Sequence, residues 1–498
     1  MNNSARQTKI EYGDFQTPLE LANLVCQKLG ELGVSPDTII EPTCGIGAFV
    51  EASARYFPKA KKIIGVEVNE TYLNRLKKRK STFSKSERIT LQQGNFFDFQ
   101  WKDMLNGVDG SILVIGNFPW VTNSQQGMIG GVNLPEKLNF QNHNGFDAMT
   151  GKSNFDISEW MLIQVGDWFQ KRNGTLAMLC KTSVARKFLH HLHTTTADVF
   201  HSAIYTIDAK KHFDASVEAC LLFCEFRENS RNYDYDVYES LESKKPQRVG
   251  HRSGMTIRDL DIFEKFSNLL YGNSELKWRS GIKHDCSEVM ELKKQDGKLI
   301  NGLDEVVEIE PTYVYPLLKG SDVANNRIKS INRFVIVPQK TVGEPTNTIK
   351  HLAPKTWKYL EKHSEQLDNR RSRIYHDNPR FSIFGVGAYT FSPYKIAICG
   401  LYKTLDFRLI GELDDKPVIF DDTVYFLSFD TEEQARKVLY TLLSQNVQDF
   451  FSSMIFWDEK RPIKTSILNR LNLQSPKTVQ ALRMFEHKNK KYVSTEGK

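Results

Sequence analysis

The chain has 498 residues, of which 40% are hydrophobic and 26% charged, and its formal net charge is +7. This composition is typical of a globular protein with two or three domains and excludes a mainly disordered or collagen-like chain. No stretch approaches the roughly 18 consecutive apolar residues of a membrane helix, so we expect no membrane association.

The polar start of the chain and the cysteines indicate a compartment. Residues 1–16 lack the apolar core of a secretion signal. The seven cysteines include no C-x-x-C pair, which is typical of free thiols in a reducing environment. We therefore expect a cytoplasmic protein.

The amino-terminal half alternates strand-like and helix-like segments. Short apolar runs predict strands at 38–42, 62–68, 89–92, 111–115, 174–180, 204–207 and 219–226. Apolar spacing predicts helices at 19–32 and 156–170, the second capped by Asp156 or Ser158. This alternation favours an α/β fold whose mostly parallel sheet is covered by helices on both faces. Because the last two strands are joined without a clear helix pattern, we expect the final strand to be antiparallel.

A polar, charged segment interrupts the alternation near residues 227–253. We predict a first domain at 1–235, a linker at 236–255, a second domain of mixed α and β structure at 256–485 and a polar tail at 486–498. Within the first domain, residues 121–155 hold five glycines and many amide side chains. A loop of this length is either a disordered excursion or a mobile lid.

Four short segments follow four of the predicted strands. They are 41–49 (EPTCGIGAF), 65–69 (GVEVN), 94–98 (GNFFD) and 117–120 (NFPW). In an open α/β sheet, ligands bind in the crevice at the carboxyl ends of the strands. We therefore expect the four segments to line one binding site.

The first three segments together indicate a nucleoside-type cofactor. Gly45 and Gly47 form a Gly-x-Gly turn that lets the main chain approach a ligand, without the third glycine of a pyrophosphate cradle. Glu67 is placed to accept both ribose hydroxyls, and Asn95 beside aromatic residues is placed to bind an adenine edge. Taken singly, each segment also fits a purely structural role, such as a tight turn or a carboxylate at a helix start.

The fourth segment indicates the group that reacts. The side-chain oxygen of Asn117 stands beside the carbonyl of Phe118, whose direction Pro119 restricts. Two such acceptors suit a planar NH₂ group, and the indole of Trp120 offers a stacking face for a planar ring. Alone, the segment fits an ordinary strand-to-loop turn equally well.

In this order the segments resemble the S-adenosylmethionine-dependent DNA methyltransferases of the gamma class, which modify the exocyclic amine of adenine. Residues 15–18 (FQTP) are similar to the amino-terminal cofactor motif of that class, and the family order continues through 156–170, 174–183 (GTLAMLCKTS) and 213–223 (FDASVEACLLF). The resemblance covers the first 230 residues. Farther on, residues 315–322 and 460–462 are similar to stretches in specificity domains of the class.

The resemblance implies S-adenosylmethionine as the cofactor and a role for each cofactor-binding residue. Thr17 would bind the methionine carboxylate, and Glu41 with the backbone of Cys44, Gly45 and Gly47 would line the methionine part. Glu67 would hold the ribose. Asn95 and the backbone of Phe96 would bind the cofactor adenine, although the family often has aspartate at position 95. Asn117 would border the same site.

The resemblance also implies that Asn117, Phe118, Pro119 and Trp120 form the catalytic motif. The Asn117 side chain and the Phe118 carbonyl would accept both hydrogens of the adenine N6 amine, which favours a tetrahedral nitrogen with a free lone pair. The base would be flipped out of the duplex and stacked on Trp120. The family usually has a second proline where this chain has Phe118; the required carbonyl is kept, and the rigidity of the turn is the open point.

The second domain is then expected to bind double-stranded DNA. Between residues 370 and 403, basic residues alternate with aromatic ones. Arginine and lysine side chains anchor phosphates and read guanine edges. The candidate DNA-binding residues are Arg371, Arg373, Arg380 and Lys283.

We expect no metal site, because His190, His191 and His193 have no cysteine or acidic partner at a ligand spacing. The family resemblance implies a monomer with a separate cognate restriction endonuclease. Two alternatives stay open. One is an RNA or protein-glutamine N-methyltransferase, since a glutamine amide is also a planar NH₂ group. The other is a catalytically inactive DNA-specificity subunit, which the departures at Asn95 and Phe118 would favour.

Overall fold

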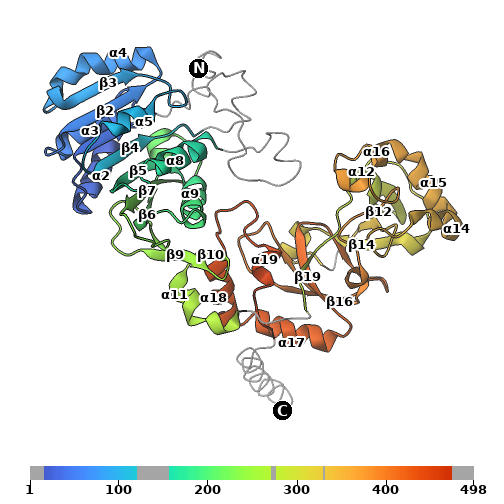
Figure 1. The fold of residues 1–498 in the computed structure, drawn as a ribbon. Helices are drawn as coiled ribbons and strands as arrows, with labels where there is room; N and C mark the ends of the chain where they lie inside the picture. Colours follow the sequence, from blue (N-terminus) through green and yellow to red (C-terminus); the bar gives the residue numbers. More distant parts are fainter. Residues whose placement is uncertain (1–15, 121–155, 271–275, 329–330, 474–498) are drawn as a thin grey trace. The chain divides into compact units, whose positions relative to one another are not determined.

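The computed structural model describes residues 16–120, 156–270, 276–328 and 331–473 (Figure 1). The chain divides into two compact units, Met1–Leu260 and Asp261–Lys498. The predicted long loop at 121–155 and the predicted tail at 486–498 lie outside the described residues. Within the described ranges, every helix is too short or too polar to cross a bilayer.

A ten-stranded sheet forms the centre of the first unit, in the order β10-β9-β8-β6-β7-β5-β4-β1-β2-β3. Its strands are β1 (Thr38–Glu41), β2 (Lys62–Glu67), β3 (Ile89–Gln93), β4 (Ile112–Asn117), β5 (Gly174–Lys181), β6 (Val199–Ile207), β7 (Ala219–Phe226), β8 (Tyr235–Tyr238), β9 (Gln247–Arg252) and β10 (Met255–Ile257). The neighbouring strands β5, β4, β1, β2 and β3 pair in parallel in that order. Strand β7 lies between β5 and β6 and is antiparallel to both. The predicted α/β fold with a mostly parallel sheet and an antiparallel final strand is confirmed.

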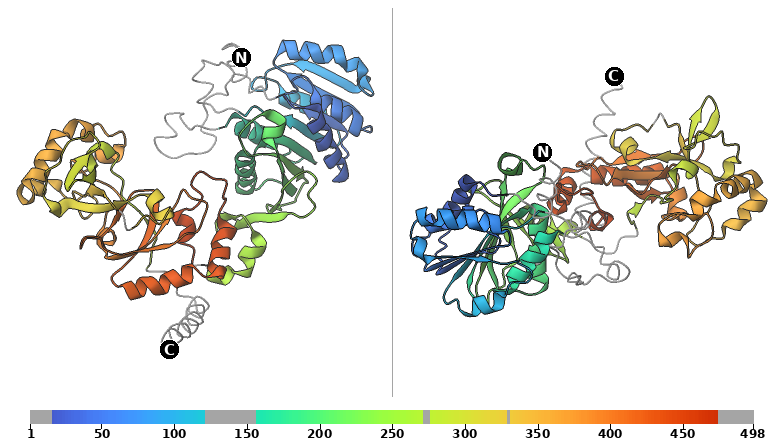
Figure 2. Two further views of the ribbon diagram at one scale, coloured as in Figure 1. Left: turned by 180° about the vertical axis from the view of Figure 1, so that it is seen from behind. Right: turned by 90° about the horizontal axis from the view of Figure 1, so that it is seen from above.

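Helices cover both faces of this sheet (Figures 1 and 2). They are α2 (Leu19–Glu31), α3 (Ala48–Tyr56), α4 (Glu70–Arg79), α5 (Trp101–Asn106), α8 (Ile157–Asp167), α9 (Thr182–Thr194) and α10 (Ala209–Phe213). Because side chains alternate along a strand, Ile39, Ile63 and Leu113 share one core with the apolar faces of α2 and α3. Helices α8 and α9 cover the opposite face. The predicted cap is Asp156, whose side chain accepts a hydrogen bond from the Ser158 amide.

The predicted linker at 236–255 is wrong. Strand β8 pairs in parallel with β6, and β9 and β10 add antiparallel strands beyond it. The division between the units therefore falls after Leu260. The segment looked like a linker because these are short outer strands in which only a few residues, such as Tyr235 and Val249, are buried.

The second unit contains two smaller sheets, which confirms its predicted mixed character. One sheet has the order β11-β19-β16-β17 and the other β13-β12-β15-β14-β18. The strands are β11 (Arg279–Ser280), β12 (Glu291–Gln295), β13 (Lys298–Asn301), β14 (Val314–Leu318), β15 (Arg333–Ile336), β16 (Tyr394–Cys399), β17 (Arg408–Ile410), β18 (Ile419–Phe420) and β19 (Val424–Phe429). The helices are α11 (Leu260–Lys265), α12 (Ser287–Met290), α13 (Gly320–Ala324), α14 (Ile349–Leu352), α15 (Pro354–Lys362), α16 (Ser364–Asp368), α17 (Glu432–Leu442), α18 (Gln445–Met454) and α19 (Thr465–Leu468).

Candidate active site

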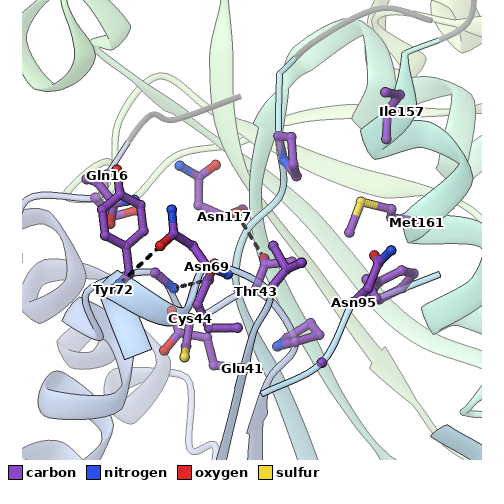
Figure 3. A pocket seen from close by; sticks show the side chains of 18 of the residues that line it. Gln16, Glu41, Thr43, Cys44, Asn69, Tyr72, Asn95, Asn117, Ile157 and Met161 are labelled. Carbon is purple, nitrogen blue, oxygen red and sulfur yellow. Dashed lines mark hydrogen bonds between the residues drawn. The ribbon is translucent and has the colours of Figure 1, made fainter. Parts of the chain in front are cut away.

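A cavity that is partly open to solvent lies at the carboxyl ends of β1, β2, β3 and β4 (Figure 3). All four predicted segments contribute to it, together with residues at the start of α2 and on α8. Its lining includes Gln16, Thr17, Glu41, Thr43, Cys44, Gly45, Glu67, Asn69, Tyr72, Asn95, Phe96, Phe97, Asn117, Pro119, Ile157 and Met161. Parallel strands bring these ends to one edge of the sheet, which is why segments so far apart in sequence meet there.

The turn after β1 has a backbone that requires glycine at two positions. Gly45 and Gly47 have φ angles of +52° and +86°. A Cβ atom on Gly45 would lie 2.5 Å from Oε1 of Gln16, and one on Gly47 would lie 2.2 Å from Cδ1 of Leu76. Gly45 lines the cavity, whereas Gly47 is the N-cap residue of α3.

Glu67 at the end of β2 is buried and holds the loops on either side of it. Its Oε2 accepts a hydrogen bond of 2.7 Å from the Gly45 amide, and its Oε1 accepts one of 2.8 Å from the Asn69 amide. These two hydrogen bonds fix the orientation of the carboxylate between the turn after β1 and the start of α4. The carboxylate is therefore positioned before a ligand arrives.

Glu41 is a second buried carboxyl group in the same cavity, with 3% of its surface exposed. Within the described part of the chain, its Oε2 has no hydrogen-bond partner. Burial raises the pKa of Glu41 well above its usual value, and the negative charge of Glu67 raises it further. A cationic amine placed beside Glu41 would supply the missing partner and restore the charged form.

The thiol of Cys44 lines the same cavity as these carboxyl groups. Burial raises the pKa of Cys44 well above its usual value, and the charges of Glu41 and Glu67 add to the effect. A thiol that stays protonated is a poor nucleophile. Cys44 is therefore better suited to packing than to nucleophilic attack.

The segment after β3 brings an amide and aromatic rings to the cavity. The Asn95 side chain donates to Oδ2 of Asp98 and accepts from the Phe97 amide, which fixes its orientation. The carbonyl of Phe96 accepts a 2.8 Å hydrogen bond from the indole of Trp101. The ring of Phe97 packs beside Trp160. An amide next to an aromatic ring is suited to the edge and face of a purine.

Asn117 closes β4 and faces the cavity with Pro119. The Thr43 hydroxyl donates to the main-chain oxygen of Asn117 over 3.3 Å, which ties the turn after β1 to the end of β4. Figure 3 shows Asn117 next to Thr43, between Gln16 and Tyr72 on one side of the cavity and Met161 on the other.

Phe118 and Trp120 do not line the cavity. Phe118 is 1% exposed, and its ring packs edge-on against Phe96 with 5.5 Å between centroids. Phe118 stands where the family usually has a proline. Because its ring is buried, it restrains the turn at this position. Trp120 is 4% exposed and packs against Phe213 with 4.9 Å between centroids. This corrects the expectation that the indole presents a free stacking face, because the ring belongs to the core between the sheet and α10.

Several lining residues were not predicted from the sequence. Gln16 accepts a 3.1 Å hydrogen bond from the Ile46 amide and so supports the glycine turn, and its position beside Thr17 in the FQTP motif was the available signal. Asn69 caps α4 by accepting from the amides of Thr71 and Tyr72. Ile157 and Met161 enter from α8, at the end of the helix that faces the strand ends.

The candidate DNA-binding residues of the second unit lie in two adjoining segments. The main chain of Lys283 pairs with that of Phe384, and Arg370 donates to the carbonyl oxygens of His284 and Ser382. Arg370 is 5% exposed and structural. Arg371 and Arg373 are exposed. Among the described residues they form no salt bridge, whereas Arg380 pairs with Asp368 at 2.7 Å and Lys283 with Asp285 at 3.3 Å.

Comparison with models of protein families gives no match. Comparison with known proteins is decisive. The chain is 56% identical over 474 residues to the type II methyltransferase M.NspV of Nostoc sp. (strain ATCC 29411 / PCC 7524), which covers 95% of this chain and 98% of that protein. The chain belongs to the type II DNA methyltransferases of restriction–modification systems.

Two further similarities agree with this family. The chain is 31% identical over 118 residues to the type II methyltransferase M.CvrRI of Paramecium bursaria Chlorella virus XZ-6E, covering 24% of this chain and 27% of that protein. The fold resembles that of the type IIL restriction-modification enzyme MmeI in complex with DNA, with a TM-score of 0.50 and 12% identity. That alignment covers 92% of this chain and 65% of the MmeI chain.

As a member of this methyltransferase family, the protein uses S-adenosylmethionine as its cofactor. The described residues fit this group. The buried carboxyl of Glu41 suits the methionine ammonium, Glu67 suits the ribose hydroxyls, and the Asn95 segment suits the adenine. The two carboxyl groups also favour a cofactor that carries a sulfonium charge.

Proposed function

We propose that the protein transfers the methyl group of S-adenosylmethionine to N6 of an adenine in a specific duplex DNA sequence. The observation that carries the proposal is the position of Asn117 and Pro119, which border the same cavity as Glu41 and Glu67. An amide oxygen at the end of β4 is thereby next to the pocket that fits the methyl donor.

The chain's own residues would act on the amine of the target base. The N6 lone pair of adenine is conjugated with the ring, which makes the nitrogen a poor nucleophile. If the Asn117 side chain and the Phe118 carbonyl accept the two N–H groups, the nitrogen becomes tetrahedral and its lone pair is free to react. Preorganised acceptors of this kind contribute about 3 kcal/mol each to the stabilisation of a transition state. The bound cofactor supplies an activated methyl group, and alignment accounts for much of the remaining rate.

The reaction requires the target adenine to leave the duplex, because N6 is paired inside it. The sequence suggested that Trp120 stacks on the extruded base. With its ring packed against Phe213, Trp120 would have to leave the core to do so. We therefore assign the acceptor role to Asn117 and Phe118 and give Trp120 the role of anchoring the motif.

The two units would divide the work. In this proposal the first unit binds the cofactor and carries out methyl transfer, and the second recognises DNA through Lys283, Arg371, Arg373 and Arg380. Exposed arginines without acidic partners suit phosphate and base contacts, so Arg371 and Arg373 are the principal candidates. We further propose that the protein acts as a monomer in the cytoplasm and protects DNA from a separate endonuclease with the same target sequence.

The test is the identity of the methylated product. Purified protein is incubated with S-adenosylmethionine labelled in the methyl group and with unmethylated genomic DNA, and the DNA is digested to nucleosides. We expect the label in N6-methyl-2′-deoxyadenosine. Label in methylated cytosine would overturn the adenine assignment, label only in RNA or protein would overturn the DNA substrate, and absence of label would favour an inactive specificity subunit.

A further inference from the structure

Three histidines meet where α9 faces the outer strands of the sheet. His190 and His193 lie one turn apart on α9, and His251 lies on β9. One ring nitrogen from each lies within 4.8 Å of those from the other two. The rings of His193 and His251 stack with 4.1 Å between centroids and 11° between planes. In the sheet, β9 is separated from β4 by β8, β6, β7 and β5, so this cluster is distinct from the cofactor cavity.

Two imidazole nitrogens of this cluster lack the partners that buried polar atoms normally have. Nδ1 of His193 and Nε2 of His251 are buried, and within the described part of the chain neither makes a hydrogen bond. By contrast, Nδ1 of His251 lies 3.2 Å from the hydroxyl oxygen of Thr256. A hydrogen bond on the remote nitrogen orients an imidazole and leaves the other nitrogen as a ligand, as in known metal sites.

The charged groups beside the cluster are paired with each other. Both oxygens of the Asp234 carboxylate accept hydrogen bonds from Arg252, at 2.8 and 2.9 Å. In the described part of the chain, the group of possible metal ligands at this place consists of three histidines. The cluster therefore offers imidazole nitrogens as its ligands.

We propose that His190, His193 and His251 bind one divalent transition-metal ion of the zinc type, which ties β9 to α9. Three imidazoles suit Zn²⁺ and related ions, whereas Mg²⁺ and Ca²⁺ prefer oxygen ligands. In a tetrahedral zinc site the nitrogen ligands lie about 3.3 Å apart, so the stacked rings must rotate toward a common point on binding. Because His190 is exposed, the fourth position is open to water.

The sequence alone indicates no metal site, because the histidines at 190, 191 and 193 have no further ligand at a nearby position. His251 lies in the segment that was predicted to be a linker, and only the pairing of β8, β9 and β10 brings it to α9. The missing ligand came from a strand, not from a cysteine or an acidic residue near the helix.

The experiment measures metal binding by the full-length chain without a polyhistidine tag. Protein stripped with a chelator is titrated with Zn²⁺ by calorimetry, and bound metal is counted after equilibrium dialysis. We expect one ion per chain, and an affinity that falls more than about 100-fold in His190→Gln and His251→Gln. The control is His351→Gln, which changes an exposed histidine on α14. His190 is also exposed, so its variant is expected to fold normally, which circular dichroism verifies.

Substitution with Co²⁺ identifies the ligand type. A site of three imidazoles gives visible d–d bands without the near-ultraviolet charge-transfer band of a cobalt thiolate, and His190→Gln should remove the bands. The proposal is overturned if Zn²⁺ does not bind at one ion per chain, or if His190→Gln binds Zn²⁺ as tightly as the unaltered chain does. It is also overturned if the cobalt spectrum shows thiolate ligation.

Discussion

The main-chain amide of Gly45 donates a 2.7 Å hydrogen bond to Oε2 of Glu67, which joins the turn after β1 to the end of β2. Glu67 therefore shapes the turn that lines the cavity. If Glu67 also binds the ribose hydroxyls, as we propose, the carboxylate would serve the cofactor site twice, once by binding the ligand and once by fixing the geometry of the turn.

Glu67→Ala is expected to weaken S-adenosylmethionine binding by about 10- to 100-fold, because hydrogen bonds to a charged group contribute about 1.5–3 kcal/mol. Calorimetric titration measures the dissociation constant. Glu70→Gln is the matched control, since Glu70 is an exposed carboxylate in the first turn of α4. An unchanged dissociation constant in Glu67→Ala would remove Glu67 from the cofactor site.

Glu41 predicts a pH dependence of cofactor affinity. Burial and the charge of Glu67 raise its pKa in the free protein, whereas a bound ammonium group favours the charged carboxylate. Binding therefore releases a proton, and affinity should increase as the pH rises from about 5 to 7, below the range in which an α-amine titrates. Titrations across this range measure the effect.

Glu41→Gln removes the titrating group. The variant should bind the cofactor more weakly at pH 7 and show a flat profile between pH 5 and 7. A profile that keeps its slope in Glu41→Gln would assign the proton to another group and contradict the placement of the ammonium beside Glu41.

Substitution of exposed arginines in the second unit should change DNA affinity without changing stability. Arg371→Ala and Arg373→Ala are expected to weaken binding of target DNA. The negative slope of log affinity against log salt concentration should become less steep, by about 0.9 for each phosphate that is no longer neutralised. Arg380→Ala should have a smaller effect because Arg380 pairs with Asp368. Fluorescence anisotropy at several salt concentrations measures both quantities; salt slopes identical to that of the unaltered chain would place the DNA surface elsewhere.

Arg370→Ala serves as the contrasting variant in that series. The buried guanidinium donates to the carbonyls of Leu367, His284 and Ser382. Its removal leaves these acceptors unpaired and should lower the free energy of unfolding by about 2–4 kcal/mol. Arg371→Ala and Arg373→Ala should leave stability within about 0.5 kcal/mol of the unaltered chain.

Glu310 predicts an acid-sensitive contribution to the stability of the second unit. Its carboxylate accepts hydrogen bonds from the amides of Lys355 and Thr356 at the start of α15, where Ala353 provides no side-chain cap. Burial alone would raise the pKa of Glu310, but these donors outweigh it and lower the pKa to about 2. The stabilisation is present above the usual pKa of 4.5 and is lost as the pH falls toward 2.

Glu310→Gln should therefore lower the free energy of unfolding by about 1 kcal/mol at pH 7, and the difference from the unaltered chain should shrink between pH 5 and pH 3. Denaturant titrations at each pH provide the measurement. Glu308→Gln, which changes an exposed neighbour, should cost less at pH 7. A difference that stays constant with pH would contradict the capping role.

The sequence predicts the sheet and its ligand edge well because both depend on local signals. Apolar runs mark β1 to β7 within a few residues, and a glycine turn, an acid and an amide follow the strands that meet at the cavity. Local signals do not predict the direction in which an individual ring points. Trp120 directly follows Asn117, Phe118 and Pro119 in sequence, but the shape of the core between the sheet and α10 directs its indole to Phe213.

The outer strands β8, β9 and β10 were not predicted, because they are defined by pairing with other strands and not by a local sequence pattern. Strands β8 and β9 are short and rich in polar residues, and they belong to the sheet because β8 pairs with β6 and β9 pairs with β8. The same pairing places His251 beside His193, a proximity that no spacing in the sequence indicates. Likewise, Arg370, Arg371 and Arg373 look alike in the sequence, and burial alone distinguishes the structural arginine from the exposed pair.

Asn117→Ala removes the side-chain oxygen at the end of β4 that we propose accepts a hydrogen bond from the target amine. The variant is saturated with S-adenosylmethionine, mixed with duplex DNA and assayed in a single turnover for N6-methyladenine. We expect the rate of methyl transfer to fall by about 100-fold or more, while the cofactor dissociation constant changes by less than about tenfold. A single-turnover rate equal to that of the unaltered chain, with cofactor bound, would show that the Asn117 side chain takes no part in methyl transfer.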